Sequence, residues 1–331
     1  MRMDAQQQST LAKAPADIPD ISVIVPFFNE HDTIADCAYR LDEFCGSMEP
    51  LRIEVVFVDD GSRDDSVDRL KKVVPHHYAS RLIKLSGNFG SHGALRAGIL
   101  HAKGAWTTFV TADLQAPLET IERLYIKCKS DGNIVWAVRE KRQAGVVERF
   151  FSGIYARFMK AYVMGNYPRE GIESVMFDAK VRAMLTSAPE TNSSLFLHIL
   201  SLGFKQDFIP CQRRKRLAGA SKWTLSKKMN LFIDSFFGFS NAPVRIVGIA
   251  GIILALIGLL LLLNISIRTL AFHLPLRGWP IVVSILLIGF GFNGISLGVI
   301  AEYVWRTLQA ARNRPAFIVD EMESISKGKA P

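Results

Sequence analysis

Short apolar runs alternate with helical stretches over the first part of the chain. Five such runs, at residues 21–26, 53–58, 81–85, 106–110 and 133–138, have the composition and length of β-strands. Strands that are apolar on both faces and alternate with helices predict an α/β fold whose sheet is mostly parallel and covered on both sides. At 331 residues, the chain has room for one such domain and an appendage.

Polar residues follow four successive runs. Pro26, Asp60, Asn88 and Asp113 all fall at the carboxyl ends of predicted strands, where ligands bind to parallel sheets. Each motif alone is typical of a turn or a helix cap. Four in succession favour a nucleotide site, and the sequence has no G-x-G-x-x-G or Walker A loop to compete for that role.

Two long apolar runs lie near the C-terminus. Residues 246–263 have no polar side chain, and residues 279–301 contain only Ser284, Asn293 and Ser296 as polar members. Each run is long enough to span a bilayer. The alternative is a pair of buried helices, which is disfavoured because a domain of this size rarely hides two helices that are apolar all round.

The net charge of +9 is concentrated next to these runs. Seven basic residues lie between Cys211 and Asn230 with no acidic residue among them, whereas the connection between the runs carries two arginines. The positive-inside rule therefore predicts that the N-terminal domain and both termini are cytosolic. Residues 223–239 mix lysines with apolar residues, which predicts an amphipathic interfacial helix.

The expected organisation follows from these patterns. Residues 1–20 are expected to be disordered, residues 21–212 to form the catalytic domain, and residues 213–242 to form a basic loop and interfacial helices. A transmembrane hairpin at 243–305 and a cytosolic tail at 306–331 complete the chain. Four scattered cysteines predict buried thiols in a reducing compartment. The second span carries four small residues that suit helix packing: Gly289, Gly291, Gly294 and Gly298. The sequence therefore leaves open whether the chain forms a homo-oligomer.

Six short motifs carry a family resemblance. They are Val-Pro-Phe-Phe-Asn-Glu at 25–30, Val-Asp-Asp-Gly-Ser at 58–62, Asn-Phe-Gly at 88–90, Ala-Asp-Leu-Gln at 112–115, Arg-Leu-Ala-Gly-Ala-Ser-Lys-Trp at 216–223 and Gly-Val-Ile-Ala-Glu-Tyr at 298–303. With them the chain resembles the inverting GT-A glycosyltransferases of the dolichol-phosphate mannose synthase type. It is most similar to bacterial bactoprenol (undecaprenyl phosphate) glucosyltransferases with two C-terminal membrane helices.

The resemblance implies a function. A sugar would pass with inversion from a nucleotide-sugar, a UDP-hexose, to undecaprenyl phosphate at the inner membrane, giving a lipid-linked donor for cell-envelope glycans. Asp113 and Gln115 would bind a divalent cation, Mg²⁺ or Mn²⁺, and Asp113, Glu173 and Arg216 would serve catalysis. The lipid phosphate would bind Arg213, Arg216 and Lys222. The nucleotide-sugar would bind Pro26, Phe28, Glu30, Asp60, Asn88 and Asp113.

Three positions depart from the family pattern. Thr111 stands where the family usually has the first Asp of its D-x-D motif, Gly87 replaces a basic residue, and Glu173 stands for the Asp of a Gly-x-Asp-Phe-Arg-Leu segment. The first two motivate an alternative, a catalytically impaired membrane protein that binds nucleotide or lipid. A processive polysaccharide synthase is disfavoured because no Q-x-x-R-W-type motif is present, and nucleic-acid binding because the basic cluster lacks interleaved aromatic residues.

Overall fold

The computed structural model describes most of the α/β domain, the two long helices and a C-terminal strand. The described residues are 18–140, 171–187, 194–212, 242–272, 278–312 and 315–325, with isolated residues at 153, 157, 159, 160, 165, 167 and 168. Residues 213–241 lie outside this set, so the predicted interfacial helix and the residues Arg213, Arg216 and Lys222 are not described.

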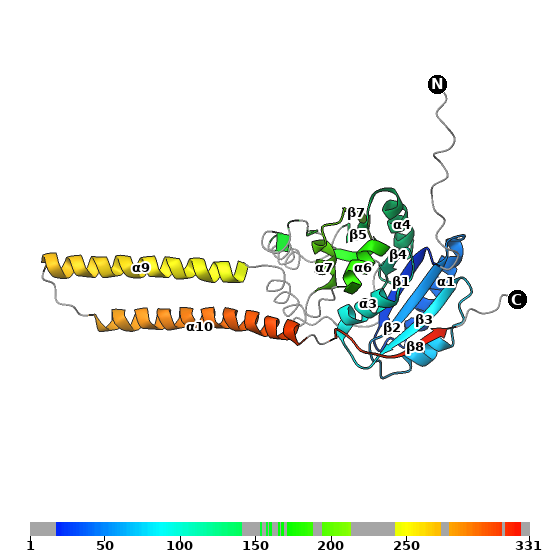
Figure 1. The fold of residues 1–331 in the computed structure, drawn as a ribbon, viewed down its shortest axis with the longest axis horizontal. Helices are drawn as coiled ribbons and strands as arrows, with labels where there is room; N and C mark the ends of the chain where they lie inside the picture. Colours follow the sequence, from blue (N-terminus) through cyan, green and yellow to red (C-terminus); the bar gives the residue numbers. More distant parts are fainter. Residues whose placement is uncertain are drawn as a thin grey trace, which may run out of the picture.

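A single mixed sheet forms the centre of the described α/β domain (Figure 1). Its strand order is β7-β5-β6-β4-β1-β2-β3-β8. The strands are β1 (Ile21–Phe27), β2 (Ile53–Asp59), β3 (Tyr78–Leu85), β4 (Trp106–Phe109), β5 (Ile134–Arg139), β6 (Ile172–Asp178), β7 (Gln206–Cys211) and β8 (Val319–Ile325). The helices of the domain are α1 (Ile34–Ser47), α2 (Ser66–Lys71), α3 (Gly90–His101), α4 (Glu119–Asp131), α6 (Ala179–Ser187) and α7 (Leu195–Ser201).

The five predicted strands are confirmed as β1 to β5. Strands β4, β1, β2 and β3 pair in parallel, as does β7 with β5, so most of the described pairings are parallel. Two strands depart from this pattern: β6 runs antiparallel between β4 and β5, and β8 runs antiparallel along β3. The carboxyl ends of β1 to β4 therefore meet at one edge of the sheet.

Helices cover both faces of the sheet, as the apolar strands predicted. On one face Val23 of β1 packs with residues of α1 and α4, including Leu41 and Leu124. On the other face Ile24 packs with residues of α3, such as Leu95. Neighbouring residues of one strand thus enter opposite cores, because successive side chains in a strand point to opposite faces. Burying each such side chain contributes about 1.5–3 kcal/mol to stability.

All four cysteines are buried free thiols, as the sequence predicted. Burial raises the pKa of the Cys45 thiol to about 12, and burial likewise raises the pKa of Cys128 to about 12. Thiols with such high pKa values are chemically inert near neutral pH. They therefore act as small apolar groups of the core.

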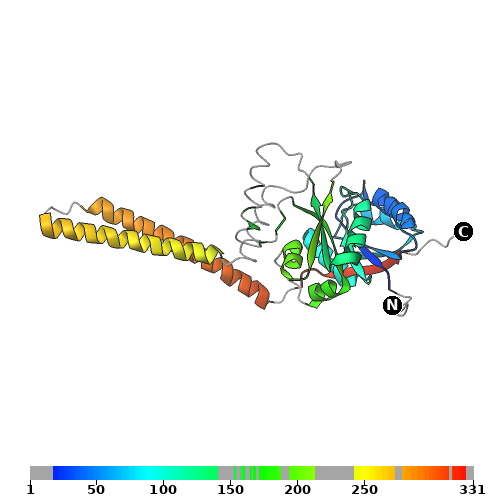
Figure 2. The ribbon, with the colours of Figure 1, turned by 90° about the horizontal axis from the view of Figure 1, so that it is seen from above.

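Two long helices extend away from the α/β domain, side by side (Figures 1 and 2). Helix α9 (Ala242–Phe272) has 31 residues and helix α10 (Trp279–Ala311) has 33. At 1.5 Å per residue these lengths correspond to about 46 and 50 Å. Both helices contain the apolar runs singled out in the sequence. Among the helices in the described part of the chain, none is both long enough and apolar enough to cross a membrane.

The chain returns to the sheet after α10. Strand β8 pairs with β3, and the Ser86 amide donates a 3.0 Å hydrogen bond to the Ile318 carbonyl just before it. Two ion pairs fasten this edge: Lys84 Nζ lies 3.0 Å from Glu321 Oε2 and Lys71 Nζ lies 2.6 Å from Glu323 Oε2. The predicted domain boundary at residue 212 therefore leaves out one strand of the sheet.

Candidate active site

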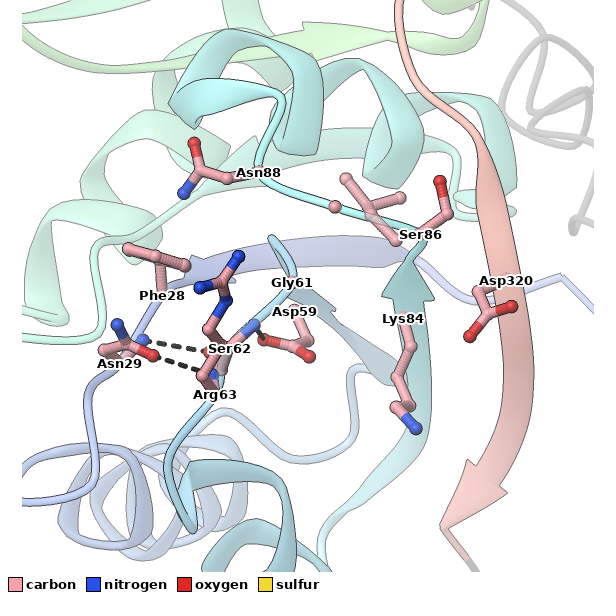
Figure 3. Close-up of a pocket in the computed structure, with 12 residues that line it drawn as sticks. Phe28, Asn29, Asp59, Gly61, Ser62, Arg63, Lys84, Ser86, Asn88 and Asp320 are labelled. Atoms are coloured by element: carbon pink, nitrogen blue, oxygen red, sulfur yellow. Dashed lines mark hydrogen bonds between the residues drawn. The ribbon is translucent and has the colours of Figure 1, made fainter.

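A cavity of about 500 Å³ opens at the carboxyl edge of β1, β2 and β3 (Figure 3). This is the edge at which ligands bind to parallel sheets, and the volume lies in the range of ligand sites. Three strand-end loops and the start of β8 line the cavity, with the residues Phe28, Asn29, Asp59, Gly61, Ser62, Arg63, Lys84, Leu85, Ser86, Gly87, Asn88 and Asp320.

Hydrogen bonds hold the loops after β1 and β2 together. The Asn29 amide donates to Ser62 Oγ, and the Arg63 amide donates to Asn29 Oδ1, each over 2.9 Å. The Glu30 amide donates to Ser66 Oγ over 2.9 Å. Asn29 has φ 50°, a left-handed conformation that asparagine tolerates better than most residues. The rim of the cavity is therefore fixed by the fold before any ligand arrives.

Gly61 allows the loop after β2 to lie directly against the loop after β3. Its φ is 75°, and a Cβ atom at this position would come within 2.6 Å of the Gly87 carbonyl carbon. Any side chain here would both strain the backbone and separate the loops. Gly87 itself has open space where a side chain would project.

Two neighbouring carboxylates at the end of β2 have different surroundings. Asp59 lines the cavity and accepts a 2.9 Å hydrogen bond from the Ser62 amide. Asp60 accepts a 2.7 Å bond from the Phe89 amide at the start of α3, where the helix dipole favours a negative charge. Burial raises the pKa of both carboxyls, that of Asp60 to about 6, while hydrogen bonds from the Phe89 and Gly90 amides oppose the rise at Asp60.

The segment after β4 presents Asp113 and Gln115. Thr111 Oγ1 donates a 2.6 Å hydrogen bond to Asp113 Oδ1, and the Leu114 amide donates to the Thr111 carbonyl over 2.9 Å. Leu114 has φ 46°. A left-handed leucine costs about 1–2 kcal/mol and persists only where its surroundings enforce it. Among the described residues, Leu114 and Asn29 alone combine a positive φ with a side chain, and both follow strands at this edge.

The segment after β4 carries two oxygen donors of the kind that divalent cations bind. Asp113 offers a carboxylate and Gln115, which is 5% exposed, a carboxamide oxygen. No group of three or more His, Cys, Asp and Glu residues suited to a metal comes together within the described residues. Mg²⁺ sites commonly use one or two carboxylates, with substrate phosphates and water completing the shell. The donor set therefore suits an ion that binds together with a diphosphate.

Glu173 lies at the same edge, at the start of β6. Its Oε2 atom is 2.7 Å from Arg139 Nε at the end of β5, and the two side chains are 8% and 24% exposed. The next residue, Ser174, donates a 2.8 Å hydrogen bond to the Phe109 carbonyl at the end of β4. Glu173 is therefore beside the strand that leads to Asp113, and its charge is balanced by Arg139.

The other predicted nucleotide residues lie around β1 and β3. Pro26 is in β1, Phe28 and Asn88 line the cavity, and Glu30 Oε2 accepts a 3.0 Å hydrogen bond from Thr33 Oγ1. Four charged residues of the cavity were not predicted from the sequence: Asp59, Arg63, Lys84 and Asp320. Two of them had a visible signal, because Lys84 lies within a predicted strand and Arg63 directly follows Gly61-Ser62.

Comparison with known proteins gives related chains over nearly the whole length. The model of the protein family described as Glycosyl transferase family 2 matches residues 22–182. An uncharacterized glycosyltransferase of Synechocystis sp. is 30% identical over 92% of this chain and 95% of its own. A prophage-derived bactoprenol glucosyl transferase of Shigella flexneri is 31% identical over 90% and 97%.

Two further proteins extend the comparison. An undecaprenyl-phosphate 4-deoxy-4-formamido-L-arabinose transferase of Klebsiella pneumoniae is 28% identical over 94% of this chain and 97% of its own. Among solved structures, a mannosyltransferase of Pyrobaculum calidifontis in complex with GDP-Man and Mn²⁺ covers 88% and 91%, with a TM-score of 0.45 and 17% identity.

Proposed function

Because the chain belongs to glycosyl transferase family 2, we propose that it transfers a sugar from a nucleotide-sugar to a polyisoprenyl phosphate. The observation that carries the proposal is the cavity at the carboxyl edge of β1 to β3. The oxygen donors Asp113 and Gln115 follow β4, which ends at the same edge of the sheet. The relatives named for bactoprenol and undecaprenyl phosphate support the acceptor, since they match over 90% or more of this chain. A UDP-hexose is the proposed donor and undecaprenyl phosphate the proposed acceptor.

The donor would lie across the carboxyl edge of the sheet. The nucleoside would enter the cavity between the loops after β1, β2 and β3, near Phe28 and Asn88. The diphosphate would extend toward Asp113 and Gln115, which hold a divalent cation in this proposal. When bound, Mg²⁺ or Mn²⁺ offsets the negative charge that builds on the leaving diphosphate. Asp113 thus combines a role in nucleotide binding with a role in catalysis.

The acceptor determines what the remaining residues need to do. The second pKa of a phosphate monoester is about 6, so a lipid phosphate is largely a dianion near pH 7 and needs no strong general base. Its oxygen would attack the anomeric carbon from the side opposite the diphosphate, which inverts that carbon. Cations that position the phosphate would therefore matter more than a base. We assign this role to Arg213, Arg216 and Lys222, and a supporting electrostatic role to Glu173.

A panel of donors tests the proposed transfer. The full chain in nanodiscs is incubated with undecaprenyl phosphate, Mg²⁺ and UDP-glucose, UDP-galactose, UDP-GlcNAc or GDP-mannose, and the lipid is analysed by mass spectrometry. A UDP-hexose is expected to give a lipid with one added hexose. Nucleotide binding without transfer from any donor, even in single-turnover assays, would instead favour a catalytically impaired binding protein, which Thr111 motivates.

Helices α9 and α10 are proposed to form a transmembrane hairpin. Large apolar side chains face outward on both: Leu260 is 64% exposed and Phe290 is 72% exposed. Lipid would cover these side chains, and Trp279 at the start of α10 suits the membrane interface. The chain leaves the α/β domain before α9 and rejoins its sheet in β8. The start of α9 and the end of α10, which connect to the α/β domain, therefore belong on the same side of the inner membrane, and we propose that this side is the cytosolic one.

Cysteine labelling tests this topology. A cysteine introduced at Thr269 is expected to react with a membrane-impermeant maleimide from outside the cell, whereas one at Ala330 reacts only after the membrane is opened. The four native cysteines give little background because all are buried. Labelling of the Ala330 position in intact cells would contradict the proposed topology.

A further inference from the structure

Strand β8, which follows the two long helices in the sequence, contributes a carboxylate to the cavity, that of Asp320. The pairing of β8 with β3 runs in register from Ser80–Ile325 to Lys84–Glu321 and then shifts, so that Leu85 faces Val319. Asp320 is the extra residue at this shift, which is a β-bulge. Bulges re-aim side chains and recur beside active sites. Figure 3 shows Asp320 projecting from β8 toward the side of the cavity where Lys84 and Asp59 lie.

The charges around Asp320 leave it available to a ligand. Lys84 is held by Glu321, with 3.0 Å between Nζ and Oε2, and Asp59 accepts the Ser62 amide. Within the described part of the chain, the Asp320 side chain has neither a hydrogen bond nor an ion pair, and the residue is exposed at the cavity wall. A carboxylate in this setting is a hydrogen-bond acceptor beside a cation.

The order of strands indicates which part of a nucleotide would reach Asp320. Asp113 follows β4, and the sheet continues from there through β1, β2 and β3 to β8. Neighbouring strands lie about 4.8 Å apart, so β8 is about 19 Å from β4. If the diphosphate binds near Asp113, the sugar of the nucleoside lies over the middle strands and the base extends toward β3 and β8.

We propose that Asp320 reads the base of the donor nucleotide and selects one with a ring N–H beside a carbonyl. The inference rests on the proposed function, since it takes the cavity to be the nucleotide site. Uracil and guanine present such an N–H, which donates to a carboxylate. Cytosine and adenine instead present a lone pair at the same ring nitrogen, and this lone pair repels a carboxylate. Lys84, beside Asp320, suits the adjoining carbonyl oxygen.

Binding of four nucleoside diphosphates tests the inference without any acceptor or transfer. Calorimetry with the full chain in nanodiscs compares UDP with CDP and GDP with ADP, pairs whose bases differ at the ring nitrogen. The wild-type protein is expected to prefer the N–H member of at least one pair by about tenfold to a hundredfold. Asp320→Ala is expected to weaken binding of that nucleotide and reduce the preference to about threefold or less. Asp320→Asn, whose amide can donate, is expected to improve binding of the disfavoured member.

Glu323→Gln is the matched control. It removes one negative charge from the same strand, but Glu323 pairs with Lys71 and does not line the cavity, so the preference is expected to stay at the wild-type value. Retention of the wild-type preference by both Asp320 variants would overturn the inference and leave the proposed function intact. Failure of the folded wild-type protein to bind any of the four nucleotides would overturn both.

Discussion

Replacing Asp113 with asparagine is expected to lower the rate of sugar transfer by about a hundredfold to a thousandfold, while nucleotide binding weakens less. The variant removes the one carboxylate of the proposed cation site and keeps its shape. The carboxamide oxygen of the substituted side chain can still accept the 2.6 Å hydrogen bond that Thr111 Oγ1 gives to Asp113, so the turn after β4 is expected to survive. The measurement is the initial rate of lipid-linked sugar formation across a titration of Mg²⁺ and Mn²⁺.

The control for this variant is Glu122→Gln, which removes an exposed carboxylate from the nearby helix α4. Its transfer rate is expected to equal that of the wild-type protein. The free energy of unfolding of both variants is expected to lie within about 0.5 kcal/mol of the wild-type value. A companion variant, Thr111→Asp, adds a second carboxylate and should lower the cation concentration needed for half-maximal rate by about tenfold. Full activity of Asp113→Asn, or wild-type activity that EDTA leaves unchanged, would exclude the cation site.

The central strands were predictable because their residues decide the matter locally. Strand β2 is buried over its whole length, so its sequence is uniformly apolar until Asp59 and the turn that follows, apart from Glu54. The strands that were not predicted, β6, β7 and β8, lack an apolar run of this kind. Strand β8 reads Val-Asp-Glu-Met-Glu-Ser-Ile, in which three acidic residues hide the strand, because an edge strand exposes one side to water. Its partners are remote as well: the Lys84–Glu321 hydrogen bond joins residues 237 positions apart.

The site was predictable to the same extent as the strands that carry it. Phe28, Asn88 and Asp113 follow predicted strands, and the structure places the first two at the cavity and Asp113 at the same edge of the sheet. The difference between Asp59 and Asp60 was not visible, because neighbouring residues at a strand end turn to different surroundings and only the loops show which faces the cavity. Asp320 could not be predicted because both the pairing of β8 and its bulge arise from tertiary structure.

The ion pair between Arg139 and Glu173 raises the question of whether Glu173 acts on the substrates or only balances Arg139. Two partly buried charges at 2.7 Å stabilise each other, and the loss of one leaves the other without compensation. Glu173→Gln is therefore expected to lower the free energy of unfolding by about 1–3 kcal/mol, less than for a fully buried pair, because Arg139 is 24% exposed. The proposed electrostatic role predicts that transfer also falls, by about tenfold to a hundredfold.

A double variant separates the two effects. In Arg139→Gln/Glu173→Gln both charges of this ion pair are removed together, so Arg139 is not left charged without its partner, and the stability lost in Glu173→Gln is expected to return. Transfer is expected to stay low, because the negative charge beside the end of β4 is still missing. Asp207→Asn serves as the control: it breaks the 3.0 Å ion pair with Lys127 at the start of β7, the opposite edge of the sheet, and is expected to leave transfer unchanged. Recovery of transfer to within about threefold of wild type in the double variant would mean that Glu173 serves only to neutralise Arg139.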